Sequence, residues 1–95
     1  MVTDKEVATA LGWGCVETLL YARENKNESD LIKSAVRKKW CNSSRCVTLC
    51  YEIDRAELSL WHYDGHDSLT VVDESELDCW KEALVWLDKK EKKDA

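Results

Sequence analysis

Hydrophobic residues recur at helical spacing through the first 40 residues, and the first such segment carries clear end signals. Thr3 and Glu6 have the spacing of a capping box, with Val2 and Val7 placed as its hydrophobic staple. Gly12 follows as a stop signal. We therefore expect a helix that begins after Thr3 and ends before Gly12.

Two more helices are predicted over residues 15–24 and 28–40, separated by the polar segment 25–27. In the first of them, four positions share one face: Val16, Leu19, Leu20 and Arg23. In the second, the residues expected to be buried are Leu31, Ile32, Ala35, Val36 and Trp40.

From residue 46 the pattern changes to alternation, which is typical of half-buried strands. Strands are predicted over residues 46–53 and 57–63, and a short third strand around residues 69–71, with Asp64-Gly65 as a tight hairpin turn. The positions expected to face the core are Val47, Leu49, Tyr51, Ile53, Leu58, Leu60, His62, Leu69 and Val71.

A final helix is predicted over residues 74–90, opened by a second capping box over Asp73–Glu76. Its main apolar stripe consists of Leu77, Trp80, Leu84 and Leu87. Trp86 falls away from this stripe and is expected at the surface. The chain is thus predicted to be a single α+β domain over residues 1–95, with three N-terminal helices, a three-stranded antiparallel β-meander and one C-terminal helix.

Composition narrows the class of protein. The chain has 95 residues, of which 44% are hydrophobic and 35% charged, as in one small globular domain. Its apolar runs are too short for a membrane span, and no secretory leader is recognisable, so we expect a cytoplasmic protein. The five cysteines form an odd set without a CxxC pair, which predicts free, mostly buried thiols and no metal site. They are Cys15, Cys41, Cys46, Cys50 and Cys79.

Charge is unevenly distributed along the chain, whose net charge is −5. Residues 1–45 carry eight basic and six acidic side chains, whereas residues 46–80 carry one basic and nine acidic side chains, a net charge of −8. An acidic field of this kind repels nucleic acid and attracts basic protein surfaces.

One short segment carries residue types suited to metal binding or acid–base catalysis. It runs from His62 through Asp64 and His66 to Asp67. Turn geometry explains Asp64-Gly65, and a half-buried core position explains His62. Cys46 and Cys50 share a strand face but have no histidine partner at a local spacing. We therefore expect no catalysis, no cofactor and no bound metal.

Aromatic and acidic residues together suggest a protein-recognition surface. If the core positions above face the helices, the opposite sheet face carries Thr48, Cys50, Glu52, Glu57, Ser59, Trp61, Tyr63 and Thr70. The candidate partner-binding residues are Glu52, Glu57, Trp61, Tyr63, Asp64, Asp67 and Trp86. Two alternatives stay open, namely that helices cover this face or that the chain forms a homodimer through it.

The segment Glu6–Gly12 resembles the first half of the helix-turn-helix found in many bacterial and phage DNA-binding proteins, a resemblance that covers Thr3 to Arg23. The basic helix over 28–40 followed by a hairpin also resembles a winged-helix module. That resemblance implies nucleic-acid binding through Lys33, Arg37, Lys38 and Arg45. A wing needs positive charge to meet phosphate, however, and this hairpin is acidic.

The sequence favours a non-catalytic module that binds a protein partner with a basic surface. Such a module would mask a basic site that otherwise receives nucleic acid. Its size and charge are similar to those of phage-encoded inhibitors of host machinery, including anti-CRISPR proteins, which is a similarity of format. The alternative is a small DNA-binding regulator that uses the basic third helix.

Overall fold

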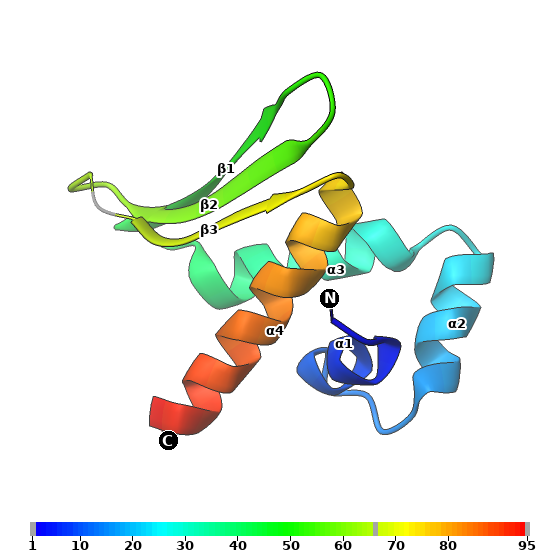
Figure 1. Cartoon of the computed structure of the whole chain (residues 1–95). Helices are drawn as coiled ribbons and strands as arrows, with labels where there is room; N and C mark the ends of the chain where they lie inside the picture. The colour runs from blue at the N-terminus through cyan, green and yellow to red at the C-terminus, as the bar shows by residue number, and fades with distance from the viewer. Residues whose placement is uncertain (1, 66, 95) are drawn as a thin grey trace.

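The computed structural model describes residues 2–65 and 67–94 and confirms the predicted order of elements. Three helices are followed by an antiparallel meander of three strands and one closing helix (Figure 1). Their bounds are α1 Asp4–Ala10, α2 Val16–Glu24, α3 Glu28–Trp40, β1 Arg45–Tyr51, β2 Ala56–His62, β3 Asp67–Asp73 and α4 Glu76–Asp94.

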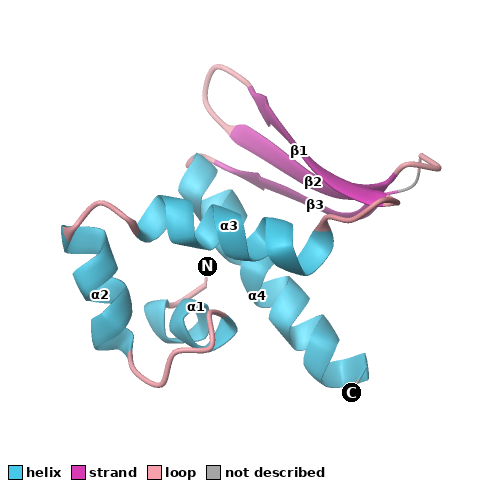
Figure 2. Cartoon of the chain, turned by 180° about the vertical axis from the view of Figure 1, so that it is seen from behind, coloured by secondary structure: helices cyan, strands magenta, loops and turns pink. Residues whose placement is uncertain are grey.

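The sheet forms one layer and the helices lie on one side of it. The strand order is β1-β2-β3, and α3 and α4 pack against the same face of the sheet. Figure 2 shows α1 and α2 on the far side of this helix pair, away from the strands. The opposite face of the sheet has no described helix against it (Figures 1 and 2).

The ends of α1 are set by the local signals that its sequence carries. The backbone N–H of Glu6 donates to Thr3 Oγ1 at 3.2 Å, and the N–H of Thr3 donates to Glu6 Oε1 at 3.1 Å. The capping box is therefore confirmed. Gly12, with φ of +83°, takes the left-handed conformation after the helix that glycine adopts at little cost.

An ionic cluster ties α2 to its neighbours. Arg23 donates to Asp4 of α1 at 2.8 Å and to Glu28, the first residue of α3, at 2.6 Å. Lys81 of α4 lies 3.8 Å from the buried Glu28 carboxylate. The guanidinium holds the pKa of Asp4 below its ordinary value, and the two carboxylates, Glu28 first, raise the pKa of Arg23. The helix buries only two apolar side chains, so this cluster supplies much of its attachment.

The predicted apolar face of α2 is only partly correct. Leu19 and Ala22 are buried, but Leu20 is exposed, and Leu31 of α3 is exposed as well. Leu31 lines an open groove beside Leu11 and Trp13. Helical spacing located the faces but overestimated their width.

The core lies between the sheet and the α3–α4 pair. Leu58 and Leu60 of β2 are completely buried, as the alternation predicts. The helices contribute a larger set, which includes Ile32, Val36, Trp40, Cys79, Trp80, Ala83, Leu84 and Leu87. Trp40 also donates its indole N–H to the carbonyl of Cys46 at 2.8 Å and so joins the end of α3 to β1.

Two predicted core positions near the first hairpin are wrong. Strand β1 ends at Tyr51, which is 68% exposed, and Ile53 is fully exposed in the turn that follows. The β1–β2 hairpin extends past the helices, so the inner face has no cover at this end (Figure 1). The Tyr51 hydroxyl instead donates to Glu76 at 2.7 Å.

The second capping box is also wrong, because α4 begins at Glu76 itself. The Asp73 carboxylate accepts from the N–H of Glu74 at 2.7 Å, one residue along rather than three. Glu76 binds distant groups, accepting from Tyr51 and lying 2.9 Å from the ammonium of Lys33. These long-range contacts cannot be inferred from a local spacing.

Candidate functional site

The side of the sheet that points away from the helices, here called the outer face, is the candidate site. The strand register pairs Cys46 with Trp61 and Thr48 with Ser59, and it pairs Ser59 with Thr70 on β3. Alternation along the strands and the register of β3 then give the members of the outer face, which are Cys46, Thr48, Cys50, Glu57, Ser59, Trp61, Asp67, Thr70 and Val72.

Two aromatic side chains stand at one end of this face. The rings of Trp61 and Tyr63 meet edge to face, with centroids 5.6 Å apart and planes at 70°. The Trp61 indole N–H donates to the hydroxyl of Thr48 on the neighbouring strand, which fixes the ring across the sheet. Tyr63 is 61% exposed, and its backbone N–H donates to the carbonyl of Ser44 at 2.9 Å. Both rings are thus held in place while remaining partly accessible.

The acidic residues lie mostly towards the ends of the outer face. Asp67 pairs in register with Trp61, and Asp64 lies in the adjoining turn, so both are near the aromatic pair. Glu57 lies further along the same face, opposite Cys50 on β1 and Val72 on β3. The structure therefore groups Trp61 and Tyr63 with Asp64 and Asp67.

Glu52 lies at the other end of the sheet, in the β1–β2 turn. Its carboxylate is 2.9 Å from Arg55 Nε, and Arg55 also lies 3.6 Å from Asp54. This pairing reduces the negative charge that the turn presents. Glu52 is consequently separated from the aromatic pair and partly neutralised.

Trp86 does not join the outer face. It lies on the helix side of the sheet, half-buried, with its ring centroid 6.4 Å from that of Trp40. Helix α3 crosses α4 at this point and supplies an apolar contact that the single-helix stripe does not show. The predicted surface position of Trp86 is corrected accordingly.

The four residues of the nucleic-acid alternative are dispersed by internal contacts. Lys33 is paired with Glu76, and Arg37 stacks over Trp80, with its guanidinium carbon 5.2 Å from the ring centroid. Arg45 stacks over the ring of Trp40. Lys38 is exposed at the surface. Among the ion pairs of the described residues, Lys33 is the only one of the four whose charge is opposed by a carboxylate.

The His/Asp segment has an ordinary structural role at its first residue. His62 is half-buried as predicted, with its ring 5.3 Å from that of Trp40 and its Nε2 3.2 Å from Ser68 Oγ. His66 lies outside the described residues. Within residues 2–65 and 67–94, no three metal-binding side chains gather at one point.

The cysteines are free, as predicted, but they are not mostly buried. Cys79 is buried, and its burial raises the pKa of the thiol. Cys50 on the outer face and Cys15 before α2 are exposed. Alternation had placed Cys50 on the face opposite the core, whereas no sequence signal distinguished Cys15.

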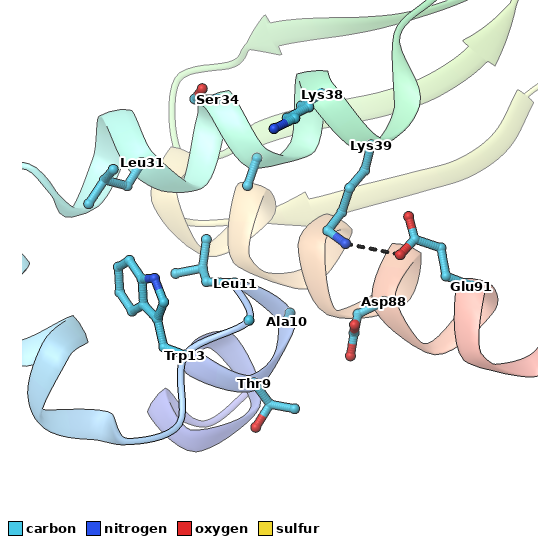
Figure 3. Close-up of a pocket in the computed structure, with 12 residues that line it drawn as sticks. Thr9, Ala10, Leu11, Trp13, Leu31, Ser34, Lys38, Lys39, Asp88 and Glu91 are labelled. Carbon is cyan, nitrogen blue, oxygen red and sulfur yellow. Dashed lines mark hydrogen bonds and ion pairs between the residues drawn. The ribbon is translucent and has the colours of Figure 1, made fainter.

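Sequence reasoning missed a groove between α1, α3 and the second half of α4, with a volume of about 660 Å³. Figure 3 shows Trp13 and Leu11 opposite Leu31 of α3, with Lys38 further along the same helix. An ion pair between Lys39 and Glu91, at 3.0 Å, lies at one end of the groove (Figure 3).

No family model, curated protein or solved structure matches this chain at a significant level. None of the helices that the structure describes is long and apolar enough to cross a membrane.

Proposed function

We propose that this chain is a non-catalytic protein-binding module whose outer face occupies a basic site on a partner protein. The observation that carries the proposal is the uncovered sheet face with its fixed Trp61–Tyr63 pair beside two acids. The partner site would be of the kind that otherwise receives nucleic acid. The chain would then act as a small acidic inhibitor, in the format of phage proteins directed against host machinery.

Aromatic and acidic residues are expected to contribute to binding in different ways. Large aromatic rings that become buried in an interface supply most of the binding free energy, roughly 2 kcal/mol or more per anchor. Acids around the rim contribute little net affinity but accelerate encounter with a basic surface and exclude acidic partners. Trp61 and Tyr63 supply the anchors here, while Asp64, Asp67 and Glu57 supply the rim.

The area of the outer face is smaller than the area that a stable interface buries. Three seven-residue strands make a flat patch of about 340 Å², from roughly 3.4 Å per residue and 4.8 Å per strand. A stable interface buries about 800 Å² on each partner. The partner must therefore contact more than the strands, and a partner centred on Trp61 and Tyr63 would also meet the adjoining Asp64 and Asp67.

The test is a capture experiment in the lysate of the cell that encodes the protein, with and without nuclease, read by quantitative mass spectrometry. Trp61→Ala is compared with Tyr21→Ala, which removes an aromatic ring that is 70% exposed on α2, far along the chain from the sheet. A partner that survives nuclease, persists with Tyr21→Ala and is lost with Trp61→Ala is the expected result.

Two outcomes would overturn the proposal. The first is equal recovery of the same proteins with both variants, which would exclude the outer face. The second is recovery that depends on nucleic acid and disappears with Lys38→Glu, which would favour the DNA-binding regulator instead.

A further inference from the structure

A small hollow lies on the helix side of the sheet, between the end of α3, the start of β1 and the second half of α4. Its volume is about 210 Å³, less than the roughly 300 Å³ at which sites for whole small molecules begin. We call it the Trp40 hollow, and its lining residues are Lys39, Trp40, Arg45, Leu87, Lys90 and Glu91. Half of these residues are basic, and they come from three separate elements.

Two of the three cations lie over aromatic rings and are not paired with carboxylates. The guanidinium carbon of Arg45 is 4.6 Å from the ring centroid of Trp40. The ammonium of Lys90 is 5.6 Å from the same ring and 5.1 Å from that of Trp86. Cation–π contact holds a positive charge in place without cancelling it. Among the side chains that the structure describes, no carboxylate forms an ion pair with Arg45 or Lys90.

The balance of charge in the hollow is positive, in contrast to the rest of the molecule. Lys39 pairs with Glu91 at 3.0 Å, so the three cations are opposed by one acid and the hollow carries a net charge of +2. The whole chain has a net charge of −5. A phosphate monoester carries about −1.5 to −2 charges at neutral pH, which matches this local excess.

Arg45 is also short of hydrogen-bond acceptors. Its Nε is buried and has no partner, and no described residue accepts a hydrogen bond from its guanidinium. The negative pole of a helix C-terminus accounts for lysines near the ends of α3 and α4, but Arg45 is the first residue of β1. An anion in the hollow would accept hydrogen bonds from this guanidinium, whose planar set of N–H donors matches the oxygens of a phosphate.

We propose that the Trp40 hollow binds a phosphate-class dianion, held by Arg45, Lys39 and Lys90. The groove with Trp13 and Leu31 adjoins it across the Lys39–Glu91 pair, and so provides room for whatever the phosphoryl group is attached to (Figure 3). This site does not rest on the proposed partner-binding function, because its residues lie on the opposite side of the sheet from Trp61 and Tyr63.

The test is an NMR titration with inorganic pyrophosphate and with inorganic phosphate, at constant ionic strength maintained with chloride. The reporters are the indole N–H signals of Trp40 and Trp86, and Trp61 on the outer face is the internal reference. Saturable shifts at Trp40 and Trp86 without a shift at Trp61 are expected. Arg45→Gln and Lys90→Gln should each weaken binding about tenfold, the effect of losing one charged hydrogen bond.

The matched control is Lys26→Gln, which removes the same charge from an exposed position between α2 and α3 and should leave binding unchanged. Lys90 is exposed, so its variant keeps the proposal testable even if Arg45→Gln does not fold. Shifts that never saturate, or an equal loss with Lys26→Gln, would overturn the proposal.

A second arm of the titration identifies the source of the phosphate. A ten-nucleotide single strand that binds more tightly than pyrophosphate, and loses affinity in both hollow variants, would assign the site to a nucleic-acid backbone. Binding of pyrophosphate alone would assign it to a free phosphate compound. A strand whose binding is unchanged in both variants, with no pyrophosphate binding, would contradict the site.

Discussion

Arg23 connects three helices through two carboxylates, and it illustrates how single residues stabilise a domain with a small core. Its hydrogen bonds to Asp4 and Glu28 compensate for the small number of apolar side chains that α2 buries. Glu28 is the buried member of the cluster, with a side chain only 8% exposed, so it depends most on its partner. The Arg23 side chain is 40% exposed, so solvent screening weakens its ion pairs.

Arg23→Ala is therefore expected to destabilise the protein by about 1–2 kcal/mol, less than the roughly 3–5 kcal/mol of a fully buried pair. The measurement is urea unfolding followed by circular dichroism. Arg55→Ala is the matched control, since Arg55 is paired only with exposed acids in a turn, and it should cost less than about 0.5 kcal/mol. Equal destabilisation by the two variants would refute a special role for the Arg23 cluster.

Glu76 makes stability depend on pH. Its pKa is held below the ordinary value, first by the Lys33 ammonium and then by the Tyr51 hydroxyl. A lowered carboxyl pKa gives stability that is present above about pH 4.3, the unfolded value, and is lost as the pH falls through the folded value.

Glu76→Gln should cost about 1 kcal/mol at pH 7, and the difference from wild type should shrink below about pH 4. Urea unfolding at pH 7, 5 and 3 measures both effects. Glu74→Gln, which removes an exposed acid from the same turn, should change stability by less than about 0.5 kcal/mol. A difference between wild type and Glu76→Gln that stays constant down to pH 3 would contradict this account.

At the scale of elements, Trp40 joins α3, α4 and the sheet. It is almost completely buried, contacts the rings of His62 and Trp86, and donates to the carbonyl of Cys46. Strand β1 is an edge strand, so this bond fixes one of its ends to the helix layer.

Trp40→Phe should destabilise the protein by about 1–3 kcal/mol, because it removes the donor to the Cys46 carbonyl and reduces packing. Hydrogen exchange of the β1 amides should accelerate more than that of β2, and this is the decisive measurement. Trp86→Phe is the control, since no described residue accepts a hydrogen bond from its indole. Equal acceleration in both strands, or equal effects of the two variants, would show that Trp40 acts only by its volume.

Sequence-based prediction succeeded where the deciding interactions are local and failed where they join distant elements. Thr3 and Glu6 define a helix end by contacts three residues apart, and the alternation of Leu58 and Leu60 reports burial on one face, so both were predictable. Ile53 and Trp86 were misplaced because their burial depends on where α3 and α4 stop or cross. Such contacts between elements leave no local pattern.

The candidate site was predictable to a similar degree. Alternation placed Trp61 and Glu57 on one face, and the structure shows that face without a described helix. The grouping of Trp61 with Asp67 depends on the register of β3, which includes an irregularity after Leu60. The Trp40 hollow was not predictable, because it brings Lys39 and Arg45 together with Lys90 of α4, a contact between elements that no local spacing reveals.

At the scale of the whole molecule, the two sides of the sheet have different chemistry. The outer face carries aromatic rings with acids at its ends, while the helix side carries the hollow with its excess of positive charge. The block of residues 46–80, with nine acids and one base, contains the outer face. A basic partner is therefore expected to approach from that side.

The charge asymmetry predicts how binding should respond to salt. Reversal of Asp64 and Asp67 to Lys should slow association with the partner severalfold at low salt, with a smaller effect at high salt, because rim charges act mainly on encounter. Stopped-flow or surface-based kinetics measures this. Reversal of Asp30, an exposed acid on α3, is the control. A salt-independent effect, or one confined to dissociation, would argue against electrostatic steering.

The most direct test of the central claim is a calorimetric titration of the captured partner with wild-type protein, Trp61→Ala and Tyr21→Ala, with and without competing nucleic acid. We predict that Trp61→Ala weakens binding about 30-fold, the equivalent of a 2 kcal/mol anchor, while Tyr21→Ala changes it less than about twofold. Nucleic acid should compete with the wild-type protein. Trp61→Ala binding within twofold of wild type, in a variant with native unfolding behaviour, would contradict the claim that the outer face is the partner-binding site.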